Sequence, residues 1–128
     1  MSALTSHRLL LVDDDNMVRE AYSELLIEYG YNVDTAYDGI DALGKMEATP
    51  YDLVIVDINM PMLDGIDLYK EVSSLYPDMK DKFLFVTGDL YGEVDAFTVF
   101  IQNNKKILKK PFTKDEFIGT IRRMLDKQ

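Results

Sequence analysis

Short apolar runs alternate with helix-like segments five times along the chain, and this alternation limits the fold more than any other feature. The runs are rich in Leu, Val, Ile and Phe, as is typical of β-strands. The first, third and fourth runs are almost continuously apolar, so we expect these strands to be buried on both faces of a sheet. The five runs occupy residues 8–12, 31–36, 53–56, 83–86 and 106–108.

Between and after these runs, apolar residues recur every three or four positions, which predicts five helices with one apolar face each. Gly30, Pro50 and Pro77 are stop signals for the first three helices. Thr113 and Glu116 have the spacing of a capping box and predict the start of the last helix. The apolar stripes are Val18, Tyr22, Leu25, Leu26 and Tyr29; Ile40, Leu43 and Met46; Ile66, Tyr69, Val72 and Leu75 or Tyr76; Leu90, Val94, Phe97 and Ile101; and Phe117, Ile118, Ile121 and Leu125.

Five β–α units in succession predict one domain over residues 8–128, preceded by a polar leader of residues 1–7. Because strands alternate with helices, we expect right-handed crossovers and a mostly parallel sheet that is covered on both faces. Five units are too few for an eight-stranded barrel, so we predict an open, doubly wound α/β sheet. Ligands bind such sheets beyond the carboxyl ends of the strands.

Polar residues follow four of the predicted strands at this edge. They are mainly acids, together with one hydroxyl and two amines. In chain order these residues are Asp13, Asp14 and Asp15, then Asp57, then Thr87, and finally Lys109 and Lys110 before Pro111.

The acids predict a cation site. One Asp at a strand end is equally well explained as a turn or capping residue, and we expect Asp15 to cap the first helix. Asp13, Asp14 and Asp57 follow strands that are usually neighbours, and two carboxylates about 4 Å apart repel by about 4 kcal/mol at an effective dielectric of about 20. A fold that gathers three of them favours a bound cation, and oxygen ligands suit Mg²⁺ better than zinc or copper.

The amine and the hydroxyl extend this prediction to phosphoryl transfer. A Lys and a Thr at the same edge can neutralise or hydrogen-bond phosphate oxygens, and this reaction needs little beyond positioning and charge neutralisation. No residue at the strand ends looks like a separate general base. The natural nucleophile is therefore a carboxylate, which would form an acyl phosphate.

Composition excludes several other classes of function. The chain has no Cys and a single His, His7, which excludes disulfides, thiolate catalysis and metal sites built on several histidines. Its formal net charge of −9 opposes binding to nucleic acid or to anionic lipid. We find no signal peptide and no stretch that could span a bilayer, so we expect a cytoplasmic protein without membrane insertion.

The sequence resembles the receiver domains of two-component response regulators. The matching stretches are LLLVDDDNMVRE (9–20), LVIVDINMPMLDGIDL (53–68), FVTGD (85–89) and KKPF (109–112). They span nearly the whole chain in the family's order, and their combination is highly specific. The resemblance implies a flavodoxin-like fold with a five-stranded parallel sheet in the order 2-1-3-4-5.

The resemblance also implies roles for individual residues. Asp57 would be the phosphoacceptor, and Mg²⁺, or Mn²⁺ as a substitute, would be held by Asp13, Asp14, Asp57 and the backbone carbonyl of Asn59. Gly65 is expected to shape the loop after Asp57 through a backbone conformation that other residues resist.

Thr87 and Lys110 would bind the phosphoryl group by the same resemblance, and the family often has a cis bond between this Lys and the following Pro111. Ile107 departs from the family, which often has Tyr or Phe at this position as the aromatic half of a conformational switch. The resemblance therefore does not extend to coupled movement of Thr87 and an aromatic side chain.

The implied function is to take a phosphoryl group from a phospho-histidine and to change conformation for a partner. The implied phosphodonor is a sensor histidine kinase or a histidine phosphotransfer domain, and a homodimer through residues 90–127 is a further option. The domain would catalyse only its own phosphorylation and dephosphorylation. We expect no output domain after residue 128, so the chain would be a stand-alone regulator or a module of a hybrid histidine kinase.

Two other functions fit the predicted fold less well. Phosphatases with an Asp nucleophile usually have a second Asp two residues later, but this position holds Asn59. A nucleotide- or flavin-binding module would favour GxGxxG after the first strand, and that pattern is missing.

Overall fold

The computed structural model describes residues 7–58, 65–88 and 107–126. The fourth helix, predicted over residues 90–101, and the backbone carbonyl of Asn59 as a metal ligand lie outside these residues. So do most of the predicted leader, residues 1–7, and most of the predicted dimer surface up to residue 106.

The described residues form one five-stranded parallel sheet, whose strands pair in the order that the family resemblance implies. The strand order is β2-β1-β3-β4-β5, as predicted. Val12 pairs with Val56, and Asp57 pairs with Val86, so β1, β3 and β4 end at the same edge. The strands are β1 (Arg8–Val12), β2 (Asn32–Ala36), β3 (Leu53–Asp57), β4 (Phe83–Thr87) and β5 (Ile107–Lys109).

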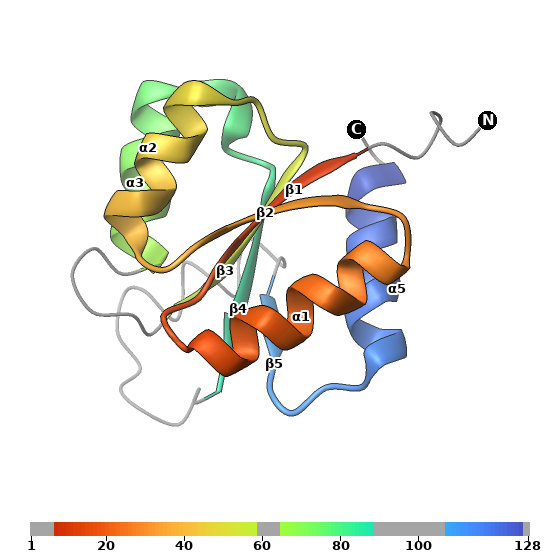
Figure 1. Cartoon of the computed structure of the whole chain (residues 1–128). Coiled ribbons are helices and arrows are strands. Elements are labelled where there is room, and N and C mark those ends of the chain that lie inside the picture. Colours follow the sequence, from red (N-terminus) through yellow and green to blue (C-terminus); the bar gives the residue numbers. More distant parts are fainter. Residues whose placement is uncertain (1–6, 59–64, 89–106, 127–128) are drawn as a thin grey trace.

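Helices cover both faces of the sheet, with α1 and α5 on one side and α2 and α3 on the other (Figure 1). Alternate residues of one strand point to opposite faces, so Leu9 packs with the α1–α5 layer and Leu10 with the α2–α3 layer. The prediction that the central strands are buried on both faces is confirmed. The helical elements are α1 (Asn16–Glu28), α2 (Gly39–Ala48), α3 (Gly65–Leu75), the 3₁₀ turn η2 (Pro77–Met79) and α5 (Lys114–Asp126).

The predicted helix ends are confirmed by their hydrogen bonds. The Asp15 carboxylate accepts from the backbone N–H groups of Met17 and Val18 at 2.9 and 3.1 Å, which caps α1. Gly30 follows this helix with φ of +92°, a backbone region that favours glycine. Thr113 and Glu116 each accept from the other's backbone N–H at 3.0 Å, which is the capping box.

The observed strand bounds differ from the predicted ones in ways that bear on the site. Strands β3 and β4 extend to Asp57 and Thr87, so both polar residues belong to the sheet and not to the loops after it. Strand β2 begins at Asn32, because the Tyr31 N–H donates to the Leu26 carbonyl at 3.2 Å and completes the end of α1 instead. Ladder pairing therefore fixes the backbones of Asp57 and Thr87.

Candidate functional site

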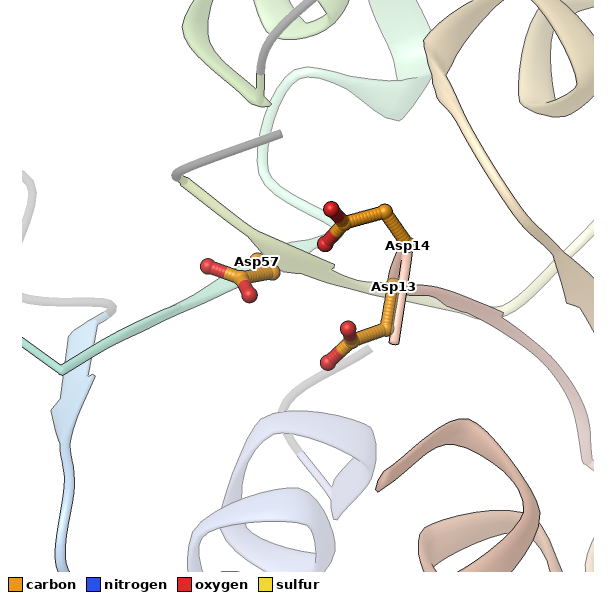
Figure 2. Close-up of side chains that lie close together, drawn as sticks. All are labelled: Asp13, Asp14 and Asp57. Atoms are coloured by element: carbon orange, nitrogen blue, oxygen red, sulfur yellow. The ribbon is translucent and has the colours of Figure 1, made fainter. Parts of the chain in front are cut away.

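Three carboxylates gather at the carboxyl edge of the sheet, as predicted. Asp13 and Asp14 directly follow β1, and Asp57 ends the neighbouring strand β3. One carboxylate oxygen from each residue lies within 4.8 Å of the other two. Figure 2 shows that the side chains of Asp13 and Asp14 leave the backbone in the direction in which Asp57 lies.

Asp13 is the most deeply buried of the three, with 3% of its surface exposed. Its N–H donates to the Ala36 carbonyl at 3.1 Å, and its Oδ1 accepts from the Asp15 N–H at 2.9 Å. Burial raises the pKa of the Asp13 carboxyl, and the nearby Asp14 and Asp15 charges raise it further. The hydrogen bond from Asp15 and the positive charge of Lys110 lower this pKa, but the direction of the sum is upward.

The donor set fits a hard divalent cation. It offers only oxygen atoms, and the carboxylates range from the buried Asp13 through the partly buried Asp57 to the exposed Asp14. The raised pKa of Asp13 shows that negative charge here is costly for the protein alone, which a cation would relieve. Carboxylates beside solvent match the way Mg²⁺ binds, with a few protein oxygens and several retained waters.

Lys110 brings a positive charge to the same edge. Its Nζ lies 4.0 Å from Asp57 Oδ2, and its side chain is 28% exposed. The Lys110 N–H donates to the carbonyl of the buried Thr87 at 2.7 Å, which joins the ends of β4 and β5. The Lys110–Pro111 peptide bond is cis, as the resemblance implied. Lys110 forms this ion pair, whereas Lys109 is the exposed end of β5.

Ile107 lies on β5 and packs against the core beneath α2 and α3. It pairs with Phe85 in the sheet, and no aromatic ring occupies this position. Tyr22 of α1 lies close to the acids, on the opposite face of the sheet from Ile107. Its ring centroid is 5.7 Å from that of Phe112 and 5.1 Å from that of Phe117. Burial raises the pKa of the Tyr22 hydroxyl, and the charges of nearby aspartates add to the rise.

Gly65 is needed for space, and the expected reason for this glycine was wrong. Gly65 is the first residue of α3, and its N–H donates to the Ile58 carbonyl at 3.3 Å. A Cβ atom on Gly65 would lie 2.8 Å from the Asp57 carbonyl oxygen and 3.0 Å from the Ile58 Cα. The backbone of Gly65 does not have the positive φ that other residues resist, whereas that of Gly30 does. Close approach of α3 to the end of β3 therefore requires glycine.

We expect Gly65→Ala to lower the free energy of unfolding by about 1–3 kcal/mol, because the new methyl group must displace the backbone beside Asp57. Urea unfolding measures this effect. Gly44→Ala is the matched control, since a Cβ at Gly44 in α2 meets no atom within 4 Å. That control should stabilise the helix by about 0.5–1 kcal/mol. Equal behaviour of the two variants would contradict the steric argument.

The sequence analysis missed Arg19 of α1, which contacts the backbone of Asp13 in the acid pair, Asp13 and Asp14, that follows β1. Its Nη1 donates to the Asp13 carbonyl at 2.7 Å, and its Nη2 donates to the Asn16 side-chain oxygen. A signal was present in the sequence, because Arg19 lies four residues after the helix cap Asp15 and so faces back over the first turn.

Comparisons of the chain with a family model and with known proteins all point to one family. Residues 9–122 match the family model described as response regulator receiver domain. The chain is 33% identical over 122 residues to the response regulator receiver protein CpdR of Brucella abortus, covering 92% of this chain and 96% of that protein. It is 38% identical over 127 residues to the sensor kinase CckA of the same organism, covering 96% of this chain but 13% of the kinase.

The chain also spans half or less of the length of other curated relatives that it matches. Among solved structures, the response regulator protein TrrA of Thermotoga maritima, in complex with Mg(2+)-BeF, is similar with a TM-score of 0.78 and 33% sequence identity. This match covers 92% of the present chain and 98% of TrrA.

Proposed function

The chain belongs to the response regulator receiver domain family, and we propose that Asp57 is the residue on which it accepts a phosphoryl group in a two-component phosphorelay. The observation that supports this assignment most is the position of the Asp57 carboxylate. It lies 4.0 Å from the Lys110 ammonium, and one of its oxygens lies within 4.8 Å of carboxylate oxygens of Asp13 and Asp14. A nucleophile, a positive charge and a cation site are thus next to one another.

In the proposed reaction, a carboxylate oxygen of Asp57 attacks the phosphorus atom of a phospho-histidine on the donor. The new P–O bond gives an acyl phosphate, and the P–N bond breaks with its electron pair remaining on the imidazole nitrogen. Lys110 binds one oxygen of the transferred group, and the Thr87 hydroxyl donates a hydrogen bond to another. The hydrogen bond between the Lys110 N–H and the Thr87 carbonyl supports this arrangement, because it holds the two residues side by side.

Asp13, Asp14 and Asp57 would hold Mg²⁺ together with the backbone carbonyl of Asn59, and Mn²⁺ could take its place on the same oxygen ligands. The bound cation would neutralise phosphoryl oxygens during transfer. The all-oxygen donor set supports this role, as does the similarity to TrrA, whose structure contains Mg(2+)-BeF.

The proposed phosphodonor is a sensor histidine kinase or a histidine phosphotransfer domain. The matching segment of a sensor kinase supports a place in such a relay, and it leaves both a stand-alone regulator and a module of a larger kinase as alternatives. A homodimer through residues 90–127, a leader at residues 1–7, a cytoplasmic location and activity only on itself stay predictions. No helix in the described part of the chain has the length and apolar content needed to cross a membrane.

Labelling with a small phosphodonor tests the function directly. Incubation with phosphoramidate and Mg²⁺ should add one phosphoryl group per chain, detected by intact mass, because the carboxylates of Asp13 and Asp14 and the ammonium of Lys110 lie next to the acceptor Asp57. Hydroxylamine should remove the group, since an acyl phosphate is labile to this nucleophile, and EDTA should prevent its formation. A label that forms in EDTA, or that survives hydroxylamine, would argue against an Mg²⁺-dependent acyl phosphate.

A further inference from the structure

Arg19 holds the peptide bond that joins the two acids following β1. The guanidinium Nη1 donates to the Asp13 carbonyl oxygen at 2.7 Å, and Nη2 donates to the side chain of Asn16. The Arg19 N–H donates to the Asp15 carbonyl at 2.9 Å, so the side chain starts from the first turn of α1. One side chain is therefore tied to both the acid pair and the helix that follows it.

The position of this carbonyl decides where the Asp14 side chain starts. A peptide unit is planar, so the Asp13 carbonyl lies in one plane with the N and Cα atoms of Asp14. The other side of Asp13 is already fixed, because its N–H donates to the Ala36 carbonyl at 3.1 Å and its Oδ1 accepts from the Asp15 N–H at 2.9 Å. The remaining movement is rotation of the peptide unit between Asp13 and Asp14. The hydrogen bond from Arg19 to the Asp13 carbonyl blocks this rotation.

The hydrogen bond from Arg19 opposes the electrostatic repulsion among the carboxylates. Two carboxylates about 4 Å apart repel by about 4 kcal/mol at an effective dielectric of about 20, which favours turning the exposed Asp14 away. A hydrogen bond from a charged donor contributes about 1.5–3 kcal/mol, which is of comparable size, whereas an uncharged bond contributes about 1 kcal/mol. A guanidinium also reaches two acceptors at once, and an ammonium binds as a single point.

We infer that Arg19 is a positioning residue for the cation site, which holds the Asp13–Asp14 peptide so that both carboxylates face Asp57 before the cation binds. This inference rests on the proposed Mg²⁺-dependent function. Arg19 acts through the backbone of the acid pair and does not touch the phosphoryl group.

Titration calorimetry of the full chain with MgCl₂ tests the inference. Arg19→Gln and Arg19→Lys should each weaken Mg²⁺ binding by about tenfold, the lower end of what loss of an orienting partner costs a metal site. Arg123→Gln is the matched control, because Arg123 lies on α5 and donates to Thr120 of its own helix at 3.2 Å. This control should keep the wild-type affinity. Phosphorylation by phosphoramidate in the Arg19 variants should need more Mg²⁺ but should reach the wild-type rate at saturation.

Arg19→Lys keeps the charge, so wild-type affinity in that variant would overturn the inference. A phosphorylation rate that stays low at saturating Mg²⁺ would also overturn it, since the defect would then not be in cation binding. Thermal unfolding followed by circular dichroism shows whether each variant is folded. If Arg19→Gln does not fold, the Mg²⁺ affinity of Arg19→Lys alone tests the inference. A wild-type chain that binds no Mg²⁺ would refute the proposed function as well, whereas undiminished binding by both Arg19 variants refutes this inference alone.

Discussion

Asp57→Asn should abolish formation of the acyl phosphate, the largest effect that we expect from a single substitution in this chain. An amide has no nucleophilic carboxylate oxygen, so the new P–O bond cannot form at this position. Asn has nearly the shape of Asp, and it removes one of three mutually repelling charges, so the fold should be retained. Intact mass after incubation with phosphoramidate and Mg²⁺ measures the loss.

Asp52→Asn is the control for this substitution. Asp52 immediately precedes β3 at its amino end, and its carboxylate accepts from the Arg8 N–H at 2.8 Å. The control removes the same charge at the opposite end of the same strand, and it should be labelled at the wild-type rate. Full labelling of the Asp57 variant would show that another side chain is the acceptor, and peptide mapping of the labelled chain would identify it.

The strands were predictable because polar residues delimit continuous apolar runs. Strand β1 has the predicted bounds, since Arg8 is exposed and Asp13 begins the acid cluster. Tyr31 was predicted to begin the second strand because of its apolar character. Its N–H instead donates a hydrogen bond to the carbonyl of Leu26 at the end of α1. A contact between neighbouring elements thus overrode the local pattern at that residue.

The acids of the site were predictable for a different reason. Parallel strands bring their carboxyl ends to one edge, so Asp13 and Asp57 could be placed together from the strand order alone. The close approach of Gly65 to the Asp57 carbonyl could not be foreseen, because it depends on where α3 returns to the sheet. Arg19 was missed for a similar reason, since the path of a long side chain decides whether it meets a carbonyl.

The position that often holds an aromatic residue in the family's switch is occupied by Ile107 in this chain. Ile107 was identified from its position before Lys110, and the structure places it against the core on the α2–α3 side of the sheet. Among the residues that the structure describes, the aromatic rings of Tyr22 and Phe112 lie on the α1–α5 side. Signalling from Thr87 to a partner after phosphorylation of Asp57 stays a prediction, because position 107 holds Ile and not an aromatic residue.

Asp13→Asn should change Mg²⁺ binding and stability in opposite directions. The variant loses the most buried carboxylate of the cluster, so Mg²⁺ binding and phosphorylation should both fall steeply. In EDTA the variant should be more stable than the wild type, because a buried carboxylate beside Asp14 is a cost that the neutral amide avoids. Its side-chain oxygen can still accept from the Asp15 N–H. Urea unfolding with EDTA and with saturating Mg²⁺ measures both effects.

The stability of the two proteins should therefore cross as Mg²⁺ is added. At a Mg²⁺ concentration about 100 times the dissociation constant, the wild type should gain about 2.7 kcal/mol of stability, and the variant should gain little.

Without Mg²⁺, the difference in stability between the wild type and the Asn variant should depend on pH. Because the pKa of Asp13 is raised in the folded state, the folded chain keeps this proton to higher pH than the unfolded chain. The contribution of Asp13 to stability is then fully present in acid and is lost as pH rises through the folded-state pKa. The advantage of the Asn variant should thus be small at acidic pH and should grow toward neutral pH, and an advantage that is independent of pH would show that burial of the Asp13 charge is not its cause.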